Sequence, residues 1–384
     1  MGDNTQNIIT LEDGWNQEIK VIALDPLEVM LEDGFKQKTK LFSHKEYAKV
    51  YTTCYNMCTQ KSPYNWSEQL YQRHGETISN YLKKCVLPAL GERHGELLLV
   101  EFVKRADNHA IMNKWHQKFF MYLDRYHVKY HQLPSLQDAG LRYYKTIVFD
   151  AVKADVTAAL VALVNAERGN AVVDRELMRR CVCVYETMGM DSLDAYVADL
   201  EVLLLSATKD YYASKAETWI AQDSTPAYML RVEQALDEEK GRVAAYLNSE
   251  SEPKLLKVLD TELLEKREAE LLEKEGSGCR VLLVNDMVGD LARMHRLFSR
   301  ITDGLVPIAD IFKSHITEMG NEKIEQRLAR VESNEKEKET NDDPQFIKDL
   351  LGVHDKYILM VSEQFQGNTL FQKALKDAFN DLVN

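Results

Sequence analysis

Apolar residues recur at intervals of three and four positions along almost the whole chain of 384 residues. This helical period is clear from Lys45 to Cys58, and no segment alternates apolar and polar residues in the way that is typical of a strand. Glycine (17) and proline (8) are scarce, although sheet-rich folds need both residues for their tight turns. The pattern therefore predicts an all-α fold of long helices joined by few loops.

The periodic segments are interrupted at three polar places. Gln60–Asn65, Glu275–Cys279 and the Glu- and Lys-rich Arg330–Pro344 are predicted to be linkers. A chain of this length is expected to form two or three packing units. The predicted helices are Lys45–Cys58, Leu97–Tyr130, Leu177–Met188, Leu193–Ser206, Tyr211–Gln222, Pro226–Leu247, Leu255–Glu273, Met287–Phe298 and Phe346–Phe365.

The formal net charge of -13 limits the kind of partner. It disfavours nucleic acid, which needs clustered Lys and Arg to neutralise phosphates, and it repels an anionic membrane surface. No apolar run approaches the ~20 residues of a membrane helix, and the first residues lack the order of a signal peptide. The sequence therefore predicts a cytoplasmic and nuclear protein that binds neither membrane nor nucleic acid. The overall charge favours basic protein partners.

Sequence motifs for catalysis, cofactors and metals are missing. The chain has no glycine-rich phosphate loop, no G-x-S-x-G elbow and no H-E-x-x-H motif. His127 and His131 lie four residues apart on a predicted helix, but zinc needs three or four ligands and nothing nearby completes the set. The cysteines lie among apolar residues and are predicted to be core thiols. We therefore expect no enzyme, no cofactor and no metal site.

Tyrosines are unusually dense in the segment Lys45–Cys58. Tyr47, Tyr51 and Cys54 cannot share a helical line with Val50 and Cys58. Core packing accounts for such rings, and so does an interface, because each ring brings apolar area and a polar tip. The residues alone leave both interpretations open.

The same segment carries a resemblance to a known family. Tyr47-x-x-x-Tyr51-Thr52-Thr53-x-Tyr55-Asn56-Met57-Cys58-Thr59 resembles the opening of cullins of the SCF (Skp–cullin–F-box) class. The match continues in order over nearly the whole chain. Further matching segments are Phe120–Tyr126, Tyr211–Tyr212, Tyr228–Met229, Glu239–Leu247, Ser249–Leu255, Asp290–Leu297, His354–Tyr357 and Phe371–Phe379.

This resemblance implies an elongated, curved stalk of three stacked helical cullin repeats. The repeats would span 15–160, 161–280 and 281–384, after a flexible N-terminal arm over 1–14. In the family a globular C-terminal half that binds a RING protein follows, and the resemblance leads us to expect that this chain lacks that half.

The resemblance also implies a function, that of a non-catalytic scaffold subunit of an SCF-type cullin-RING ubiquitin ligase complex. Repeat 1 would bind a Skp-type adaptor and, through it, F-box proteins, on the helices around Tyr47–Cys58 and Asn108–Tyr122. One departure is Ala106, where relatives often carry tryptophan. The implied adaptor-binding residues are Tyr47, Val50, Tyr51, Cys54, Asn108, His109 and Met112.

The resemblance also suggests further partners, and two alternative functions remain open. A RING protein would bind only through the missing half, and the cullin exchange factor is a further candidate partner. One alternative is a cullin of another class with a BTB-type or propeller-type adaptor. A second is an unrelated helical-repeat tethering protein.

Overall fold

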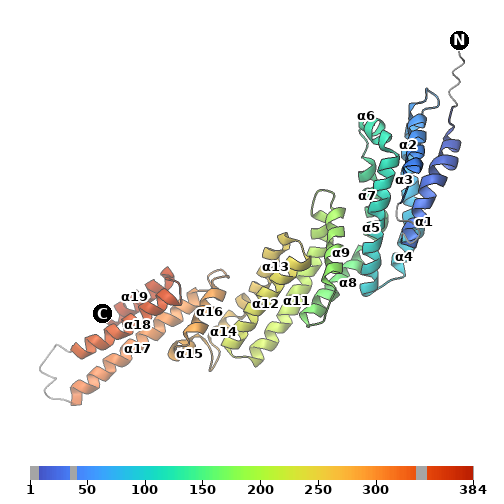
Figure 1. Ribbon diagram of the computed structural model, residues 1–384. Helices are drawn as coiled ribbons and strands as arrows, with labels where there is room; N and C mark the ends of the chain where they lie inside the picture. The colour runs from blue at the N-terminus through green and yellow to red at the C-terminus, as the bar shows by residue number, and fades with distance from the viewer. Residues whose placement is uncertain (1–7, 35–40, 334–343, 384) are drawn as a thin grey trace, which may run out of the picture. The chain divides into compact units, whose positions relative to one another are not determined.

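The computed structural model describes residues 8–34, 41–333 and 344–383 of the chain. These residues form helices joined by short connections, with no strand among them, which confirms the predicted all-α fold (Figure 1). They gather into two compact units. Unit 1 runs to Leu204 and takes in Ala245–Leu247, and unit 2 holds the remaining described residues. The division into three repeats stays a prediction.

Unit 1 is built from long helical rods in which segments labelled η continue the α-helices. Such continuous rods include η1 with α1, α3 with η2 and α4, and α7 with η4 and α8. The elements are η1 (Asp13–Leu24), α1 (Asp25–Asp33), α2 (His44–Thr59), α3 (Ser67–Tyr81), η2 (Leu82–Val86), α4 (Leu87–Gly91), α5 (Gly95–Phe119), η3 (Leu123–Val128), α6 (Lys129–His131), α7 (Leu136–Tyr144), η4 (Lys145–Phe149), α8 (Asp150–Arg168), α9 (Arg175–Met188), α10 (Asp194–Tyr196) and η5 (Val197–Glu201).

Helix α5 is the central element of unit 1. It packs against α1, α2, α4, α7, α8 and α9, so most of its circumference is covered (Figure 1). Leu99, Phe102, Met112 and Phe119 are fully buried along it. Burying one such side chain contributes roughly 1.5–3 kcal/mol, which makes α5 the main apolar support of the unit.

Unit 2 has a separate core centred on three phenylalanines. Phe312 lies 5.4 Å from Phe365 and 5.6 Å from Phe371, measured between ring centroids, and Phe365 stacks on Phe371 at 4.1 Å. The elements that complete the chain are α11 (Val202–Gln222), α12 (Thr225–Tyr246), η6 (Ser249–Ser251), α13 (Glu252–Leu259), η7 (Asp260–Leu264), η8 (Glu265–Arg267), α14 (Glu268–Leu272), α15 (Cys279–Val284), α16 (Val288–Phe298), α17 (Val306–Ser333), α18 (Pro344–Glu363) and α19 (Thr369–Val383).

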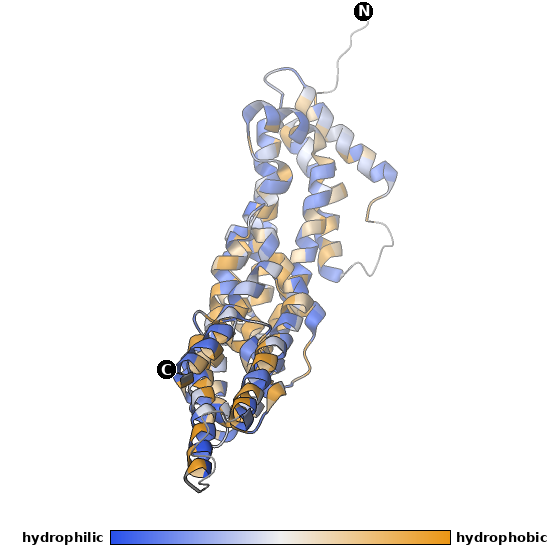
Figure 2. Ribbon diagram, turned by 90° about the vertical axis from the view of Figure 1, so that its left-hand side faces the viewer, coloured by the Kyte–Doolittle hydropathy of each residue, from blue (hydrophilic) through white to orange (hydrophobic). Residues whose placement is uncertain are grey.

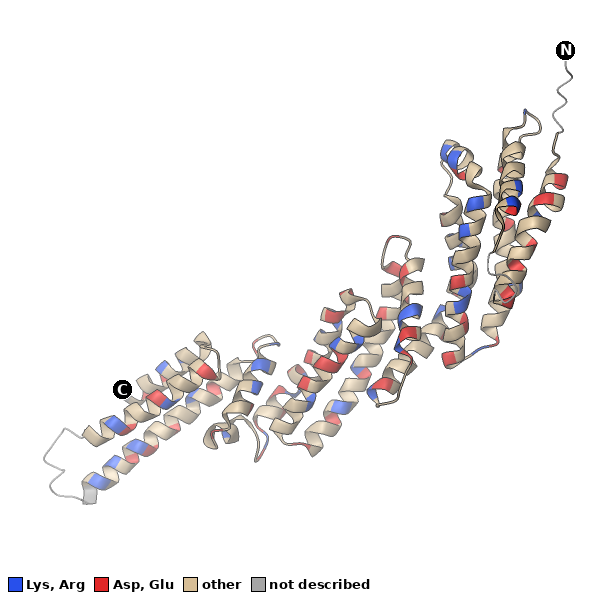
Figure 3. Ribbon diagram, viewed as in Figure 1, with Lys and Arg blue, Asp and Glu red and all other residues tan. Residues whose placement is uncertain are grey.

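The helices are amphipathic in both units. Apolar and polar segments alternate along them in Figure 2, and residues of both charge signs are spread over them in Figure 3. Most helices therefore bury one stripe and leave a solvated face, whereas α5 is covered on most sides. None of the helices in the described part of the chain is long and apolar enough to cross a bilayer.

Two predicted linkers lie between helices, and the third lies only partly within the described residues. Gln60–Asn65 separates α2 from α3, and Glu275–Cys279 separates α14 from α15 except that Cys279 begins the latter helix. Of Arg330–Pro344, the first four residues belong to α17 and Pro344 begins α18, while 334–343 lie outside the described residues.

The single helix predicted for Leu97–Tyr130 is wrong at one point. Helix α5 ends at Phe119, and Phe120 leaves the helical conformation with φ -100° and ψ 20°. Both phenylalanines are fully buried, but Phe119 packs near Tyr47 and Phe120 stacks on Trp15. Packing against two different neighbours ends the helix here although the apolar period continues past it.

The flexible arm predicted for residues 1–14 is wrong for residues 8–14. Helix begins at Leu11, and the backbone of Ile9 is held on both sides. Its N–H donates to Gln60 Oε1 at 2.6 Å, and its carbonyl accepts from Gln60 Nε2 and Trp66 Nε1, both at 3.0 Å. These bonds fix Ile9 to the connection between α2 and α3. Residues 1–7 lie outside the described residues.

Candidate protein-interaction face

Helix α2 starts at a capping box and has one face in the core. Ser43 Oγ accepts from the Glu46 N–H, and Glu46 Oε2 accepts from the Ser43 N–H at 2.8 Å, which satisfies two of the free donors of the first turn. Val50, Cys54 and Met57 are at most 1% exposed. The capping box fixes where α2 begins, and the three buried residues fix which side of α2 faces the core. The opposite side is therefore exposed to solvent.

Three tyrosines, four residues apart, follow the outer side of α2. Tyr47 and Tyr51 are half-buried and stack on each other with ring centroids 6.2 Å apart, and Tyr47 also lies 6.3 Å from Phe119 of α5. Tyr55 is 43% exposed and meets Tyr122 edge-on at 5.1 Å. Neighbouring rings therefore hold one another while their outer edges stay accessible.

Aromatic residues of α5 and of the segment after it extend this line. Trp115 is half-buried, lies 4.9 Å from Phe42 and carries Lys118 Nζ 4.5 Å above its ring. Tyr122 packs 4.5 Å from Tyr126, which is 58% exposed. Burial, followed by the neighbouring Tyr126, raises the pKa of Tyr122. We call this surface the aromatic face and define it by Tyr47, Tyr51, Tyr55, Trp115, Tyr122 and Tyr126.

The three residues predicted on the second helix do not lie on this face, and this prediction is wrong. Asn108, His109 and Met112 are 6%, 2% and 0% exposed. Asn108 Nδ2 donates to the Leu31 carbonyl at 2.9 Å, and His109 Nε2 lies 2.9 Å from the Gly140 carbonyl oxygen. These side chains therefore face α1 and α7, because α5 is surrounded on that side, and no partner reaches them without opening the core.

The prediction is also wrong for Val50 and Cys54. Both were predicted to contact an adaptor, and both are 1% exposed. Burial raises the pKa of the Cys54 thiol well above its usual value, as expected for a core cysteine. Of the residues predicted as a docking site, Tyr47 and Tyr51 alone keep an accessible surface. Whether they bind a partner stays a prediction.

Four members of the aromatic face were not among the predicted site residues. They are Tyr55, Trp115, Tyr122 and Tyr126. In the sequence the last three repeat at intervals of seven and four residues, which would place them on one side of an unbroken helix, although α5 ends at Phe119. That spacing was a usable signal, but choosing this side over the opposite one required knowing where the neighbours of α5 lie.

A cluster of buried histidines lies within unit 1. His74 and His116 have ring centroids 5.2 Å apart, and both pack near Phe120. His74 Nε2 and the Nδ1 atoms of His109 and His116 have no hydrogen-bond partner in the described part of the chain. Burial lowers the pKa of His74 and of His109 to about 4, so both rings are neutral near pH 7.

No metal-binding arrangement is found among the described residues, where no group of three or more His, Cys, Asp and Glu side chains converges. His127 and His131 do lie together, with ring centroids 4.5 Å apart. A pair of imidazoles without a third ligand falls short of a zinc site.

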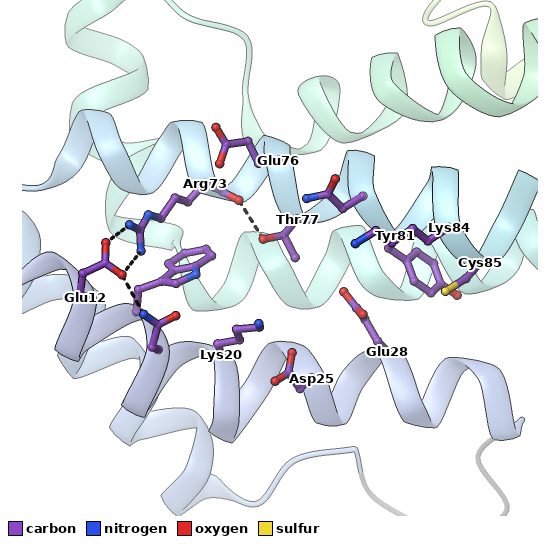
Figure 4. A pocket seen from close by; sticks show the side chains of 13 residues that line it. Glu12, Lys20, Asp25, Glu28, Arg73, Glu76, Thr77, Tyr81, Lys84 and Cys85 are labelled. Atoms are coloured by element: carbon purple, nitrogen blue, oxygen red, sulfur yellow. Dashed lines mark hydrogen bonds and ion pairs between the residues drawn. The ribbon is translucent and has the colours of Figure 1, made fainter.

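The charged groove beside η1 and α3 also lacks a catalytic arrangement (Figure 4). Its volume is about 470 Å³. Arg73 forms an ion pair with Glu12 and lowers the pKa of that carboxyl, while burial raises the pKa of Glu28. Lys20 and Lys84 add positive charge to the wall. Basic and acidic groups are thus interleaved, and burial raises the pKa of the Cys85 thiol, which also lines the groove.

Comparison with known proteins decides the family. Residues 28–384 match the model of the cullin alpha solenoid domain. The chain belongs to the cullin family.

Individual cullins match over most of this chain. Rice (Oryza sativa subsp. japonica) Cullin-1 is 42% identical over all of it, and the chain spans 51% of that relative. Putative cullin-like protein 2 of Arabidopsis thaliana is 38% identical over 95% of the chain, which covers 92% of that shorter protein. Dictyostelium discoideum Cullin-3 is 31% identical over 89% of the chain and is covered over 43% of its length. The chain thus spans about half the length of the longer cullins it matches.

Proposed function

We propose that the chain is a non-catalytic scaffold subunit of an SCF-type cullin-RING ubiquitin ligase. In this proposal the aromatic face binds a Skp-type adaptor, which carries an F-box protein. The single observation that carries the proposal is the line of six accessible or half-accessible aromatic rings shared by α2 and the α5 region. Membership in the cullin family supports a scaffold and not an enzyme.

The energetics of the face suit a protein partner. Tyr and Trp dominate binding hot spots because each buries a large area at little cost in side-chain entropy. The contacts within the face hold the rings in place before binding, so a partner loses less free energy in ordering them. Tyr55 and Tyr126 offer the most free surface.

The rest of the proposal follows from the family. Packed helical units resist deformation, so a substrate receptor docked on unit 1 would be held at a set position. A RING protein would bind a C-terminal half of the kind that longer cullins have, and the cullin exchange factor is a further proposed partner. We propose that the complex works in the cytoplasm and the nucleus, which imaging of the tagged chain tests.

Co-elution of the chain with a purified Skp-type adaptor in size-exclusion chromatography tests the proposal. We expect a stable complex with the wild-type chain and loss of the complex with Tyr51→Ala/Tyr126→Ala. The matched control is Leu351→Ala/Leu359→Ala, which removes side chains that are 55% and 56% exposed on α18. The proposal fails if the wild type does not co-elute, or if both double variants bind equally.

A second candidate is a cullin of another class, whose adaptor is a BTB-type or propeller-type protein. The match to a protein named Cullin-3 favours it. The same chromatography with these adaptors separates the two candidates, since a preference for either over the Skp-type adaptor would transfer the proposal to that class. The family match sets aside the unrelated tethering protein.

A further inference from the structure

Four basic side chains form a row beside the aromatic face. Lys114 and Lys118 lie on α5, Arg125 lies in η3 and Lys129 begins α6. All four are exposed. Within each pair the spacing is four residues, which places both members on one side of a helix. We call these four residues the basic row.

The basic row lies on the helical segments that carry part of the aromatic face. Lys118 Nζ sits above the Trp115 ring, and Arg125 immediately precedes Tyr126 in the chain. Lys114 likewise precedes Trp115. A partner that covers Trp115 therefore also meets Lys118, and the other three charges lie on the helical segments that carry Trp115 and Tyr126.

None of the four side chains forms an ion pair with the described residues. Some other surface cations of unit 1 do so, as Lys49 does with Glu18 and Arg73 does with Glu12. Asp124 is the acidic side chain nearest in sequence, but its Oδ1 accepts from the Leu136 N–H at 2.9 Å and its Oδ2 accepts from Gln117 at 3.4 Å. That carboxylate is engaged by the start of α7 and does not neutralise the row.

The row is notable because the chain as a whole has a net charge of -13. Like charges four residues apart destabilise a helix by about 0.2–0.5 kcal/mol per pair, so helix stability does not favour the spacing within each pair. Figure 3 shows basic residues at the end of unit 1 that carries α6. The overall charge predicts basic partners, whereas this surface has the opposite local sign.

From this geometry we infer that the partner of the aromatic face presents a row of carboxylates to Lys114, Lys118, Arg125 and Lys129. This inference rests on the proposed function and names the chemistry of the adaptor's docking surface. The acidic side chains draw the partner into place, and the aromatic rings then hold it. Complementary charge of this kind acts chiefly on the rate of association.

A nucleic acid is the competing polyanion, since basic side chains next to aromatic rings also suit single strands. Two observations favour the protein. The rings pack on one another through their edges and faces instead of standing free for bases to stack, with Tyr55 edge-on to Tyr122. The net charge of -13 also repels a long phosphate backbone.

The experiment measures the association rate of the full chain with a Skp-type adaptor by stopped-flow fluorescence. The test variant is Lys114→Glu/Arg125→Glu, which leaves Lys118 on its tryptophan. The matched control is Lys373→Glu/Lys376→Glu on α19, which changes the net charge equally at two exposed lysines. At about 0.05 M salt we expect the test variant to associate about tenfold more slowly or worse, with little change in dissociation rate. Raising the salt concentration should reduce the difference in association rate between the wild-type chain and the test variant.

An unchanged association rate in a test variant that still binds the adaptor overturns the inference and leaves the proposed function standing. If the wild-type chain binds no adaptor at any salt, the proposed function fails, and a labelled oligo-glutamate peptide then tests the row alone by fluorescence anisotropy. Peptide binding that the test variant loses and the control keeps supports the inference. Equal binding by both variants, or stronger binding of an oligo-dT strand than of the peptide, overturns it.

Discussion

In unit 1 Tyr55 and Tyr126 are 43% and 58% exposed, whereas in unit 2 Tyr228 and Tyr357 are 0% and 1% exposed. The buried pair have bonded hydroxyls. Tyr228 donates to the Leu263 carbonyl at 2.8 Å, and the Tyr357 hydroxyl lies 2.6 Å from a ring nitrogen of His315. Among the described residues, the large exposed hydrophobic side chains of unit 2 are aliphatic or Met and none is a tyrosine.

The difference teaches that tyrosine content alone does not identify an interface. Tyr228 is a core residue whose polar tip is satisfied internally, while Tyr55 and Tyr126 leave that tip in water. The same amphipathic ring serves both purposes. A tyrosine becomes a core residue where another helix covers its position and stays exposed where none does. Substitutions should therefore have different effects on stability and on binding in the two units.

The largest expected effect concerns the buried histidines of unit 1. The folded-state pKa of His74 and of His109 is lowered to about 4 from 6.5, so the unfolded chain binds protons first as the pH falls. The contribution of these two neutral histidines to the free energy of unfolding is complete above pH 6.5 and is lost as the pH falls from 6.5 to about 4. Over this range each group lowers the free energy of unfolding by up to about 1.4 kcal/mol per pH unit. Urea unfolding across this range measures it.

The control for this prediction compares two histidine variants. His74→Phe should flatten the dependence of unfolding free energy on pH, because it removes one of the buried rings. His131→Gln, at an exposed position, should leave the dependence as in the wild type. Parallel curves for all three proteins would contradict the assignment of the acid sensitivity to the buried cluster.

The next prediction compares how much a buried and a half-buried side chain of α5 contribute to stability. Met112→Ala should lower the free energy of unfolding by about 2–5 kcal/mol, because it leaves a cavity in a fully buried site. Ile111→Ala, at the half-buried neighbouring position, should cost clearly less. Chemical denaturation followed by circular dichroism gives both values, and equal losses would mean that α5 is not oriented as described.

Tryptophan substitutions compare the two units in binding. Trp115→Ala should weaken adaptor binding by about 2 kcal/mol, or roughly thirtyfold in Kd, since it removes a ring of the aromatic face. Trp219→Ala in unit 2, another half-buried tryptophan, should leave Kd unchanged. Isothermal titration calorimetry with the Skp-type adaptor measures both, and a similar loss from each would place the docking surface elsewhere.

The smallest effect uses one chemical change at two tyrosines. Tyr228→Phe should destabilise unit 2 by about 1–3 kcal/mol, because the Leu263 carbonyl loses its buried donor. Tyr126→Phe should be close to neutral for stability, since water replaces the partner of an exposed hydroxyl. Thermal unfolding measures both losses. A larger loss of stability for Tyr126→Phe than for Tyr228→Phe would contradict the prediction.

Much of this molecule was predictable from local sequence patterns. The helical period of α2, the Gln60–Asn65 linker and the family resemblance each depend on residues close together in the chain. Such features are set by backbone preferences and amphipathic spacing, which act over a few turns of helix. The identity of Tyr47 and Tyr51 as outward rings was within reach for the same reason.

The orientation of α5 was decided by tertiary structure alone. Its apolar and polar residues surround the helix, so the sequence does not distinguish the line of His109 and Met112 from the line that carries Trp115. Packing against α1, α7, α8 and α9 buries the first line and leaves the second beside the tyrosines of α2. A one-dimensional pattern reports how often a helix returns to the same side, whereas the choice of the covered side depends on neighbours that are distant in the chain.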